Sequence, residues 1–220
     1  MTLEIDNVEL SFSKKTILNG IYLKAETGKI TGILGRNGCG KSSLLEIIFG
    51  RLKPKYKLVR VNKKPILKPL YLTKLVKYLP QNSLASKQLK LKTAFKLYDI
   101  DWNVFENRFK LFSKYKHLRF SQLSGGEQRV VEIYLTLKSS GKIVLLDEPF
   151  SHIAPLYIEH IKSMLNEEKH EKVIIITDHY YKDIIDVSDT LYLIHNKSSK
   201  LIKNLSELED HHYLNIGSLA

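Results

Sequence analysis

The chain has 220 residues, of which 43% are hydrophobic, and a formal net charge of +12. This length is enough for one full hydrophobic core with a smaller subdomain attached. Its apolar runs, such as 143–146 and 173–176, are strand-sized and far short of the ~18 residues that cross a bilayer, so we predict no membrane-spanning segment. The chain has one cysteine, and Glu4 and Asp6 stand where a secretory leader would be apolar. We therefore expect a reducing, cytoplasmic location.

The positive charge is concentrated between Arg51 and Tyr98, a segment with fourteen Lys or Arg residues and no Asp or Glu. Such a segment suits nucleic acid or an anionic membrane surface. A solvated lysine-rich surface with no partner explains it equally well. The sequence leaves these three interpretations open.

The first half of the chain predicts strands on both sides of a glycine-rich loop. Apolar residues alternate over 3–12 and 21–25, which is typical of half-buried antiparallel strands. A helix is expected from Lys41 to Gly50, because glycine suits the C-terminal cap. Two short strands follow at 58–61 and 76–79, and Pro80 closes the second.

A change of period predicts a small helical insertion between Asn82 and Gln122. Its apolar residues recur at helical spacing, and we expect this stripe to form core: Val104, Phe105, Phe109 and Phe112. The later elements expected are a helix through 130–137, a central parallel strand at 143–146, a helix from Pro155, a buried strand at 173–177, a strand at 190–195, a turn at 197–200 and a short helix from Ser206.

The run Gly35–Ser42, with the sequence GRNGCGKS, lies between a predicted strand and a predicted helix. Glycines there let backbone N–H groups turn inward around phosphate oxygens, and the helix N-terminus adds its positive dipole end. In this pattern Lys41 reaches the β- and γ-phosphates and the Ser42 hydroxyl holds Mg²⁺. A glycine-rich turn with a chance lysine is the alternative, and the flanking strand and helix argue against it.

Two further strand ends carry groups that complete a phosphate site. Asp147 and Glu148 follow one buried strand, and His179 follows the next. In open parallel sheets ligands sit beyond the carboxyl ends of strands, so these side chains can converge. Asp147 would bind Mg²⁺, Glu148 would polarise the attacking water, and His179 would contact the γ-phosphate. Each alone is commonly structural; their joint occurrence behind a phosphate loop predicts nucleotide hydrolysis.

The motifs together resemble the nucleotide-binding domain of the ATP-binding cassette (ABC) family over nearly the whole chain. GRNGCGKS is similar to its Walker A motif, Gln81 to its Q-loop glutamine, LSGGE at 123–127 to its signature, IVLLDEP at 143–149 to its Walker B motif, and His179 to its switch histidine. Phe12 lies where the family places an aromatic ring on adenine. LSGGE is the most specific of these motifs, because Walker A alone indicates only a P-loop NTPase.

The resemblance implies an α/β fold: a P-loop NTPase core with a mostly parallel sheet, an N-terminal antiparallel β subdomain, and a helical insertion with the signature at about 83–140 within one domain, 1–220. It implies ATP and Mg²⁺ as cofactors. The implied catalytic residues are Glu148, His179 and Gln81, and the implied metal ligands are Ser42, Gln81 and Asp147. The implied nucleotide-binding residues are Phe12, Gly35, Asn37, Gly38, Cys39, Gly40, Lys41, Ser42, Ser43, Ser124, Gly125 and Gly126.

In the family, the signature at a helix N-terminus closes over the γ-phosphate held by a second subunit. The resemblance therefore implies an ATP-sandwiched pair, either a homodimer or a pair with a second ABC subunit, peripheral at the inner face of the cell membrane on transmembrane permease subunits. One departure from the family pattern concerns the coupling between the two ATP sites across this interface. Ala154 stands where the family usually has an aspartate. The insertion between Gln81 and Leu123 is also short for the family.

We expect an ATP-hydrolysing subunit of an ABC transporter. One alternative is a soluble ABC-type ATPase that acts on nucleic acid, a partner that we do not expect. The other is a regulatory module that holds ATP without turnover, against which Glu148 and His179 argue. We also expect the helix N-terminus and Lys41 to favour a reactive thiolate at Cys39. The transported substrate is not encoded in these motifs.

Overall fold

The computed structural model describes residues 1–13, 15–215 and 217–218, and it builds two sheets. The N-terminal sheet is antiparallel, with strand order β2-β1-β4-β5. Its strands are β1 (Thr2–Phe12), β2 (Lys15–Glu26), β4 (Tyr56–Val61) and β5 (Lys64–Pro65). Apolar residues of β1 alternate between buried and less buried positions, which confirms the prediction of half-buried strands.

The second sheet has six strands in the order β10-β9-β3-β8-β7-β6, and all neighbours except the β9–β10 pair are parallel. These strands are β3 (Ile30–Gly35), β6 (Val76–Leu79), β7 (Ile143–Asp147), β8 (Val173–Thr177), β9 (Thr190–His195) and β10 (Ser198–Ile202). The residues of β3, β7 and β8 are buried throughout, as expected for strands covered on both faces.

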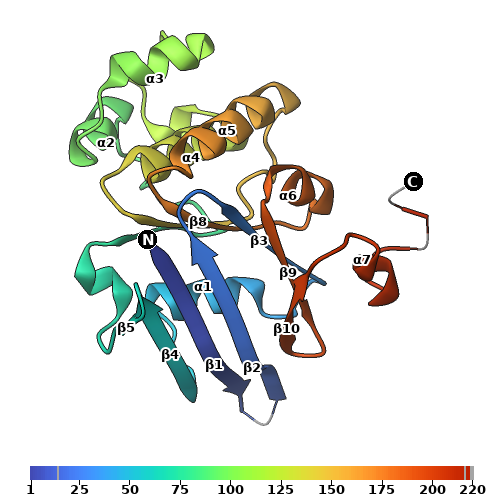
Figure 1. The fold of residues 1–220 in the computed structure, drawn as a ribbon. Helices are drawn as coiled ribbons and strands as arrows, with labels where there is room; N and C mark the ends of the chain where they lie inside the picture. Colours follow the sequence, from blue (N-terminus) through green and yellow to red (C-terminus); the bar gives the residue numbers. More distant parts are fainter. Residues whose placement is uncertain (14, 216, 219–220) are drawn as a thin grey trace.

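Helices cover both faces of the parallel sheet. Helix α1 (Lys41–Phe49) packs on one face together with the antiparallel sheet, and Figure 1 shows β1 and β2 in front of it. Gly50 ends this helix in the left-handed conformation, as predicted. The other face carries α4 (Gly125–Lys138), α5 (Pro155–Glu168) and α6 (Tyr181–Val187).

The segment after β6 is helical and lies at the end of the molecule away from β1, β2 and β4 (Figure 1). It contains α2 (Leu91–Leu97), α3 (Trp102–Arg108) and the short 3-10 turns η2 (Lys110–Phe112) and η3 (Phe120–Gln122). The expected phenylalanine stripe is buried, and Phe105 lies with its ring centroid 4.8 Å from that of Tyr134 in α4. Val104 is the exception, because it is 58% exposed and faces away from this cluster.

Several elements were missed or misjudged. The expected turn at 197–200 is wrong: Asn196 and Lys197 form the turn with positive φ, and β10 already begins at Ser198. This is a two-residue hairpin whose return strand is too polar to be read from hydrophobic alternation. Helix α6 and strand β5 were not predicted. The two remaining elements are η1 (Leu70–Thr73) and α7 (Glu207–Asp210), the latter confirming the short C-terminal helix.

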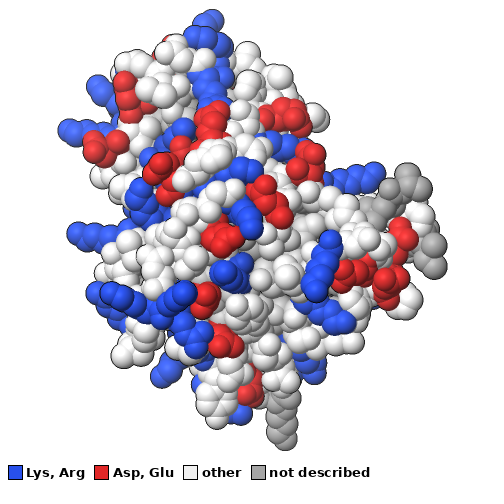
Figure 2. Space-filling view, viewed as in Figure 1, with Lys and Arg blue, Asp and Glu red and all other residues white. Residues whose placement is uncertain are grey.

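The basic segment 51–98 runs from the end of α1 over β4, β5, η1 and β6 into α2. Figure 2 shows Lys and Arg side chains gathered along the edge of the molecule where β4 and β5 lie. Part of this charge is compensated by acidic residues from outside the segment. The pairs are Arg51 with Glu46, Lys55 with Glu9, and Arg60 with Asp6.

Candidate functional site

The loop between β3 and α1 has the geometry that an anion site needs. Gly40, at the N-terminus of α1, has a φ of 104°, which L side chains rarely adopt. A Cβ atom at Gly40 would also lie 2.7 Å from Cδ2 of Leu18. Glycine is therefore required there both by conformation and by space. Because glycine has no side chain to cap the helix, the first N–H groups of α1 are left for a ligand.

Lys41 and Ser42, the first residues of α1, point to different partners. Lys41 donates from Nζ to the backbone oxygen of Gly35 at 2.7 Å, so its ammonium group stays inside the loop. Ser42 donates from Oγ to Oδ1 of Asp147 at 3.1 Å. That bond joins the phosphate loop directly to the C-terminal end of β7.

Asp147 is 1% exposed, and its second carboxylate oxygen accepts a hydrogen bond from the hydroxyl of Tyr78 at 3.2 Å. Burial raises the pKa of Asp147 to about 6, although both hydroxyl groups favour the charged form. Burial and the neighbouring carboxylate also raise the pKa of Tyr78. Tyr78 is not predictable as a site residue from local sequence, because its contact with Asp147 depends on β6 pairing with β7.

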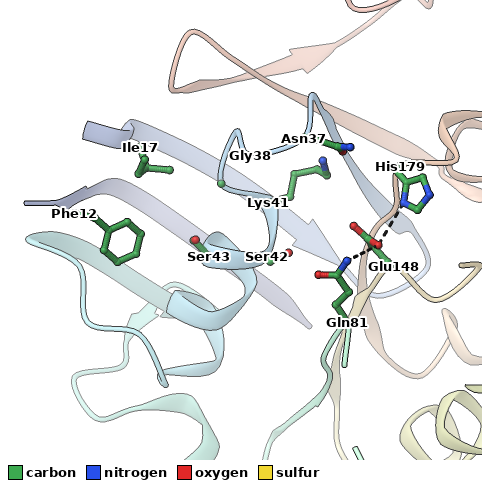
Figure 3. A pocket seen from close by; sticks show the side chains of 11 residues that line it. Phe12, Ile17, Asn37, Gly38, Lys41, Ser42, Ser43, Gln81, Glu148 and His179 are labelled. Carbon is green, nitrogen blue, oxygen red and sulfur yellow. Dashed lines mark hydrogen bonds and ion pairs between the residues drawn. The ribbon is translucent and has the colours of Figure 1, made fainter. Parts of the chain in front are cut away.

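Glu148 lies next to Asp147 with a φ of 50°, so the chain turns sharply after β7. Its backbone N–H donates to Thr177 O at 2.7 Å, which fixes this turn against β8. Gln81 donates from Nε2 to Oε2 of Glu148 at 2.9 Å, and Nδ1 of His179 lies 3.3 Å from the same oxygen. Figure 3 shows these three side chains pointing toward one another beside the phosphate loop.

A cavity of about 460 Å³ opens between the phosphate loop and these groups. Phe12 lies at the end of the cavity opposite His179 (Figure 3), and its ring is 51% exposed. Ile17 of β2 also lines the cavity, and no sequence motif predicts it. The other lining residues are Asn37, Gly38, Gly40, Lys41, Ser42, Ser43, Gln81 and Glu148, all of them predicted.

Two predicted residues of the loop, Gly35 and Cys39, do not line the nucleotide cavity. Gly35 lies at the end of β3, and the thiol of Cys39 packs against it on the far side of the loop. Cys39 lines a different cavity, of about 320 Å³, with Arg36, His195 and Tyr213. Burial raises the pKa of the Cys39 thiol and outweighs the opposing effect of Lys41. The expectation of a reactive thiolate in the nucleotide cavity is therefore wrong.

The signature residues lie apart from this cavity in the same chain. Ser124 caps α4 by accepting a hydrogen bond from Glu127 N at 3.3 Å, and Glu127 accepts one from Ser124 N at 2.8 Å. Gly125 lines a second cavity of about 470 Å³, which also contains Gln81 and Glu148. Gly126 packs so closely that a Cβ atom there would lie 2.6 Å from His152 O.

Three buried charged groups around the site were missed. Arg129 in α4 donates to Pro80 O at 2.7 Å and to Glu148 O at 3.2 Å, and burial lowers its pKa. Asp178 accepts hydrogen bonds from the backbone N–H groups of Phe150 at 2.9 Å and Tyr180 at 3.0 Å. Glu132 accepts three hydrogen bonds from residues 83–85. A charged residue on the apolar face of a predicted helix is the only signal that could have found Arg129 and Glu132.

Comparison with known proteins assigns this arrangement to a family. The family model described as ABC transporter matches residues 18–151, more than half of the chain. The chain belongs to the ABC transporter family. The predicted resemblance and the α/β fold are thereby confirmed, and the protein is an ATP-binding, ATP-hydrolysing subunit of a transporter.

Individual relatives agree with this membership. The lipopolysaccharide export system ATP-binding protein LptB of Haemophilus influenzae is 26% identical over 207 residues, which cover 87% of this chain and 86% of the relative. LptB of Escherichia coli K12 is 27% identical over 214 residues and covers 88% and 86%. Among solved structures, an ATP-binding subunit of an ABC transporter has a TM-score of 0.81 at 21% identity and covers 100% of this chain and 96% of its own.

Both LptB relatives are ATP-binding proteins of an export system. Across residues 1–13, 15–215 and 217–218, no helix combines the length and the apolar character that spanning a bilayer demands.

Proposed function

We propose that the cavity at the phosphate loop binds Mg-ATP and that this chain hydrolyses it to power transport. The observation that carries the proposal is the meeting of three strand ends: Lys41 and Ser42 after β3, Asp147 and Glu148 after β7, and His179 after β8. Lys41 and the N–H groups of the loop bind the β- and γ-phosphates. Phe12 stacks on the adenine at the open end of the cavity.

Glu148 is the proposed general base. Water attacks the γ-phosphorus, the bond to the β-phosphate oxygen breaks, and Glu148 takes the proton from the water. Gln81 and His179 both contact Oε2 of Glu148, at 2.9 and 3.3 Å, and so orient its carboxylate. His179 also contacts the γ-phosphate in this proposal.

Mg²⁺ fits the oxygen atoms that the chain supplies here. Ser42, Gln81 and Asp147 offer a hydroxyl, an amide carbonyl and a carboxylate, which are the hard ligands that Mg²⁺ prefers. Asp147 is buried, with its pKa raised to about 6, so a nearby cation would favour its charged form. Bound Mg²⁺ would neutralise charge that develops on the phosphate oxygens.

We further propose that two copies, or this chain and a second ABC subunit, enclose two ATP molecules head to tail. Ser124, Gly125 and Gly126 begin α4 outside the cavity of their own chain, which leaves them available to the γ-phosphate bound by the partner. Ala154, at the N-cap of α5, carries no carboxylate for coupling across this interface. Hydrolysis to ADP then releases the pair.

The proposed place of the protein is on transmembrane permease subunits, peripheral at the inner face of the membrane. A cavity of about 330 Å³ beside η1 and α2 supports this proposal, because it is lined by aromatic and aliphatic side chains next to the Q-loop. They include Phe49, Tyr71, Tyr78, Leu84 and Tyr98. The helical insertion at about 83–140 would form the rest of this contact. Cargo is selected by the membrane subunits in such systems, so we propose no cargo.

Glu148→Gln and Lys41→Ala test the proposed function. Lys41→Ala should lose tight ATP binding, because it removes the cation inside the loop. Glu148→Gln should bind ATP, lose turnover by roughly 10²–10⁴-fold and elute as an ATP-bound dimer on size-exclusion chromatography with Mg-ATP. Glu171→Gln, at an exposed carboxylate, is the control. A monomeric Glu148→Gln protein with normal turnover would remove Glu148 from catalysis.

The same experiment separates the alternatives. A regulatory module would bind ATP with no turnover in the unmodified protein. A nucleic-acid ATPase would show turnover stimulated by DNA or RNA. The basic segment has few aromatic residues that could stack on bases. We therefore expect DNA and RNA not to stimulate ATP turnover.

A further inference from the structure

One turn of α4 holds the whole segment 80–85, which we call the Q-loop segment. At its start, Arg129 donates to Pro80 O at 2.7 Å. At its end, Oε1 of Glu132 accepts hydrogen bonds from Ser83 Oγ at 2.7 Å, Leu84 N at 2.8 Å and Ala85 N at 3.0 Å. Both ends of the irregular segment are therefore attached to side chains one helical turn apart.

The two anchoring side chains also contact each other. Nη1 of Arg129 lies 3.6 Å from Oε2 of Glu132, and the side chains are only 9% and 3% exposed. A buried carboxylate is tolerated where donors and a cation compensate its lost hydration. Here three donors from the Q-loop segment and one guanidinium group do so. The charge of Glu132 is thus compensated mainly by the segment that it holds.

The position of these anchors connects three parts of the molecule. Gln81, inside the segment, donates to the carboxylate of Glu148 in the nucleotide cavity. Leu84, near its end, lines the aromatic cavity beside η1 and α2. Helix α4 itself begins at the signature, with Ser124 as its cap. A displacement of α4 would therefore be passed to Gln81 and to Leu84 together.

We propose that Glu132 is a positioning residue for ATP hydrolysis. Together with Arg129 it attaches the Q-loop segment to α4, an attachment that we call the latch, and so sets the position of Gln81 relative to Glu148. This inference rests on the proposed function of Gln81 and Glu148. Glu132 acts through the segment, because its carboxylate is used by Ser83, Leu84 and Ala85 rather than by the nucleotide cavity. When a partner subunit binds the signature, the latch carries that event to the hydrolytic groups.

The variants Glu132→Ala and Glu132→Gln test the latch. Glu132→Ala leaves three donors without an acceptor, so the segment loosens and kcat should fall at least about tenfold, as expected for a slightly misplaced catalytic group. ATP affinity should stay within about threefold, because the phosphate loop is untouched. The Mg²⁺ concentration for half-maximal turnover should rise, since Gln81 is a proposed ligand. Glu132→Gln keeps one acceptor oxygen and should recover most of kcat.

A structural role alone would give a different pattern. Leu137→Ala, a buried position on the same helix, should lower Tm without changing kcat per folded molecule or the Mg²⁺ dependence. Hydrogen exchange provides a readout that needs no activity: the amides of Leu84 and Ala85 should lose protection in Glu132→Ala and keep it in Leu137→Ala. If Glu132→Ala does not fold, Ser83→Ala removes one of the three bonds and should shift both readouts in the same direction.

Two results would overturn the latch. One is an unchanged kcat and Mg²⁺ dependence in folded Glu132→Ala, and the other is unchanged exchange at Leu84 and Ala85 in that variant. Failure of the proposed function looks different, because the unmodified protein would then lack ATPase activity. The exchange rates of the nucleotide-free protein would still decide whether Glu132 holds the segment.

Discussion

Replacing Asp147 by asparagine should make the nucleotide-free protein more stable while it destroys activity. Asp147 is 1% exposed, and burial raises its pKa from 3.8 to about 6. Charging this carboxyl at neutral pH therefore opposes folding. A difference of about two pKa units corresponds to about 3 kcal/mol at pH 7. Asparagine has the same shape, avoids this cost and can still hydrogen-bond to the hydroxyl groups of Ser42 and Tyr78.

The pH dependence of the effect follows from the direction of the shift. The folded protein holds the Asp147 proton more tightly than the unfolded chain, so stability from this group is present at low pH and is lost as pH rises from about 4 to about 6. Asp147→Asn should thus be more stable than the unmodified protein above pH 6. The difference should shrink toward zero as pH falls toward 4.

Thermal unfolding at a series of pH values measures this difference. A gain of about 3 kcal/mol would raise Tm by roughly 6–12 °C in a chain of this size. Asp210→Asn, at an exposed position, serves as the control, and Mg-ATP should stabilise the unmodified protein but not Asp147→Asn. An Asp147→Asn protein that is equally or less stable at pH 7.5, or whose gain is the same at pH 5, would refute the reasoning.

Phe12 lines one end of the nucleotide cavity, and Cys39 lies on the far side of the phosphate loop. Phe12→Ala should raise the KM for ATP by roughly threefold to tenfold, since a single aromatic stack contributes about 1 kcal/mol, with little change in kcat; an unchanged KM would place adenine elsewhere. Cys39 should react slowly with a maleimide at pH 7, because burial raises its pKa, and bound ATP should give little protection, because the thiol faces the cavity of Arg36 and Tyr213. Fast labelling that ATP blocks would contradict this orientation of the thiol.

Much of the fold follows from local patterns that a sequence displays directly. Alternation predicts β1, and continuous apolar runs predict β7 and β8, because burial on one or both faces leaves a period in the sequence. The polar strand β10 leaves no such period. It forms because Asn196 and Lys197 accept positive φ and return the chain to the edge of the sheet.

Residues of the candidate site also fall into two groups: those that local motifs predict and those that depend on the tertiary fold. Lys41, Ser42 and Glu148 could be predicted because motif spacing places them at strand and helix ends. Tyr78 could not, because its bond to Asp147 spans 69 residues and depends on which strands are neighbours. Cys39 shows a further limit: spacing places it in the loop but does not say toward which side its thiol turns.

The lysines of the basic segment that have no acidic partner are the ones that could contact an anionic membrane surface. Arg51, Lys55 and Arg60 are paired with acidic residues, and Lys57 donates to Ile47 O. Exposed lysines remain in the connection between α1 and β4 and around β5 and η1, where Leu67 and Leu72 are also exposed. Lysines beside apolar side chains are typical of surfaces that lie on a membrane. The lysines concerned are Lys53, Lys63, Lys64, Lys68 and Lys74.

Replacing these five lysines by glutamine should weaken binding to anionic liposomes at least about tenfold, because each is worth about 1 kcal/mol near a negative leaflet and only some can reach it at once. Binding of the unmodified protein should also fall with salt, since the Debye length shortens. ATP affinity should not change. The matched control replaces five exposed lysines elsewhere: Lys110, Lys114, Lys182, Lys197 and Lys203. Equal loss in both variants would mean a general charge effect, and DNA-stimulated turnover lost only in the first would assign this surface to nucleic acid.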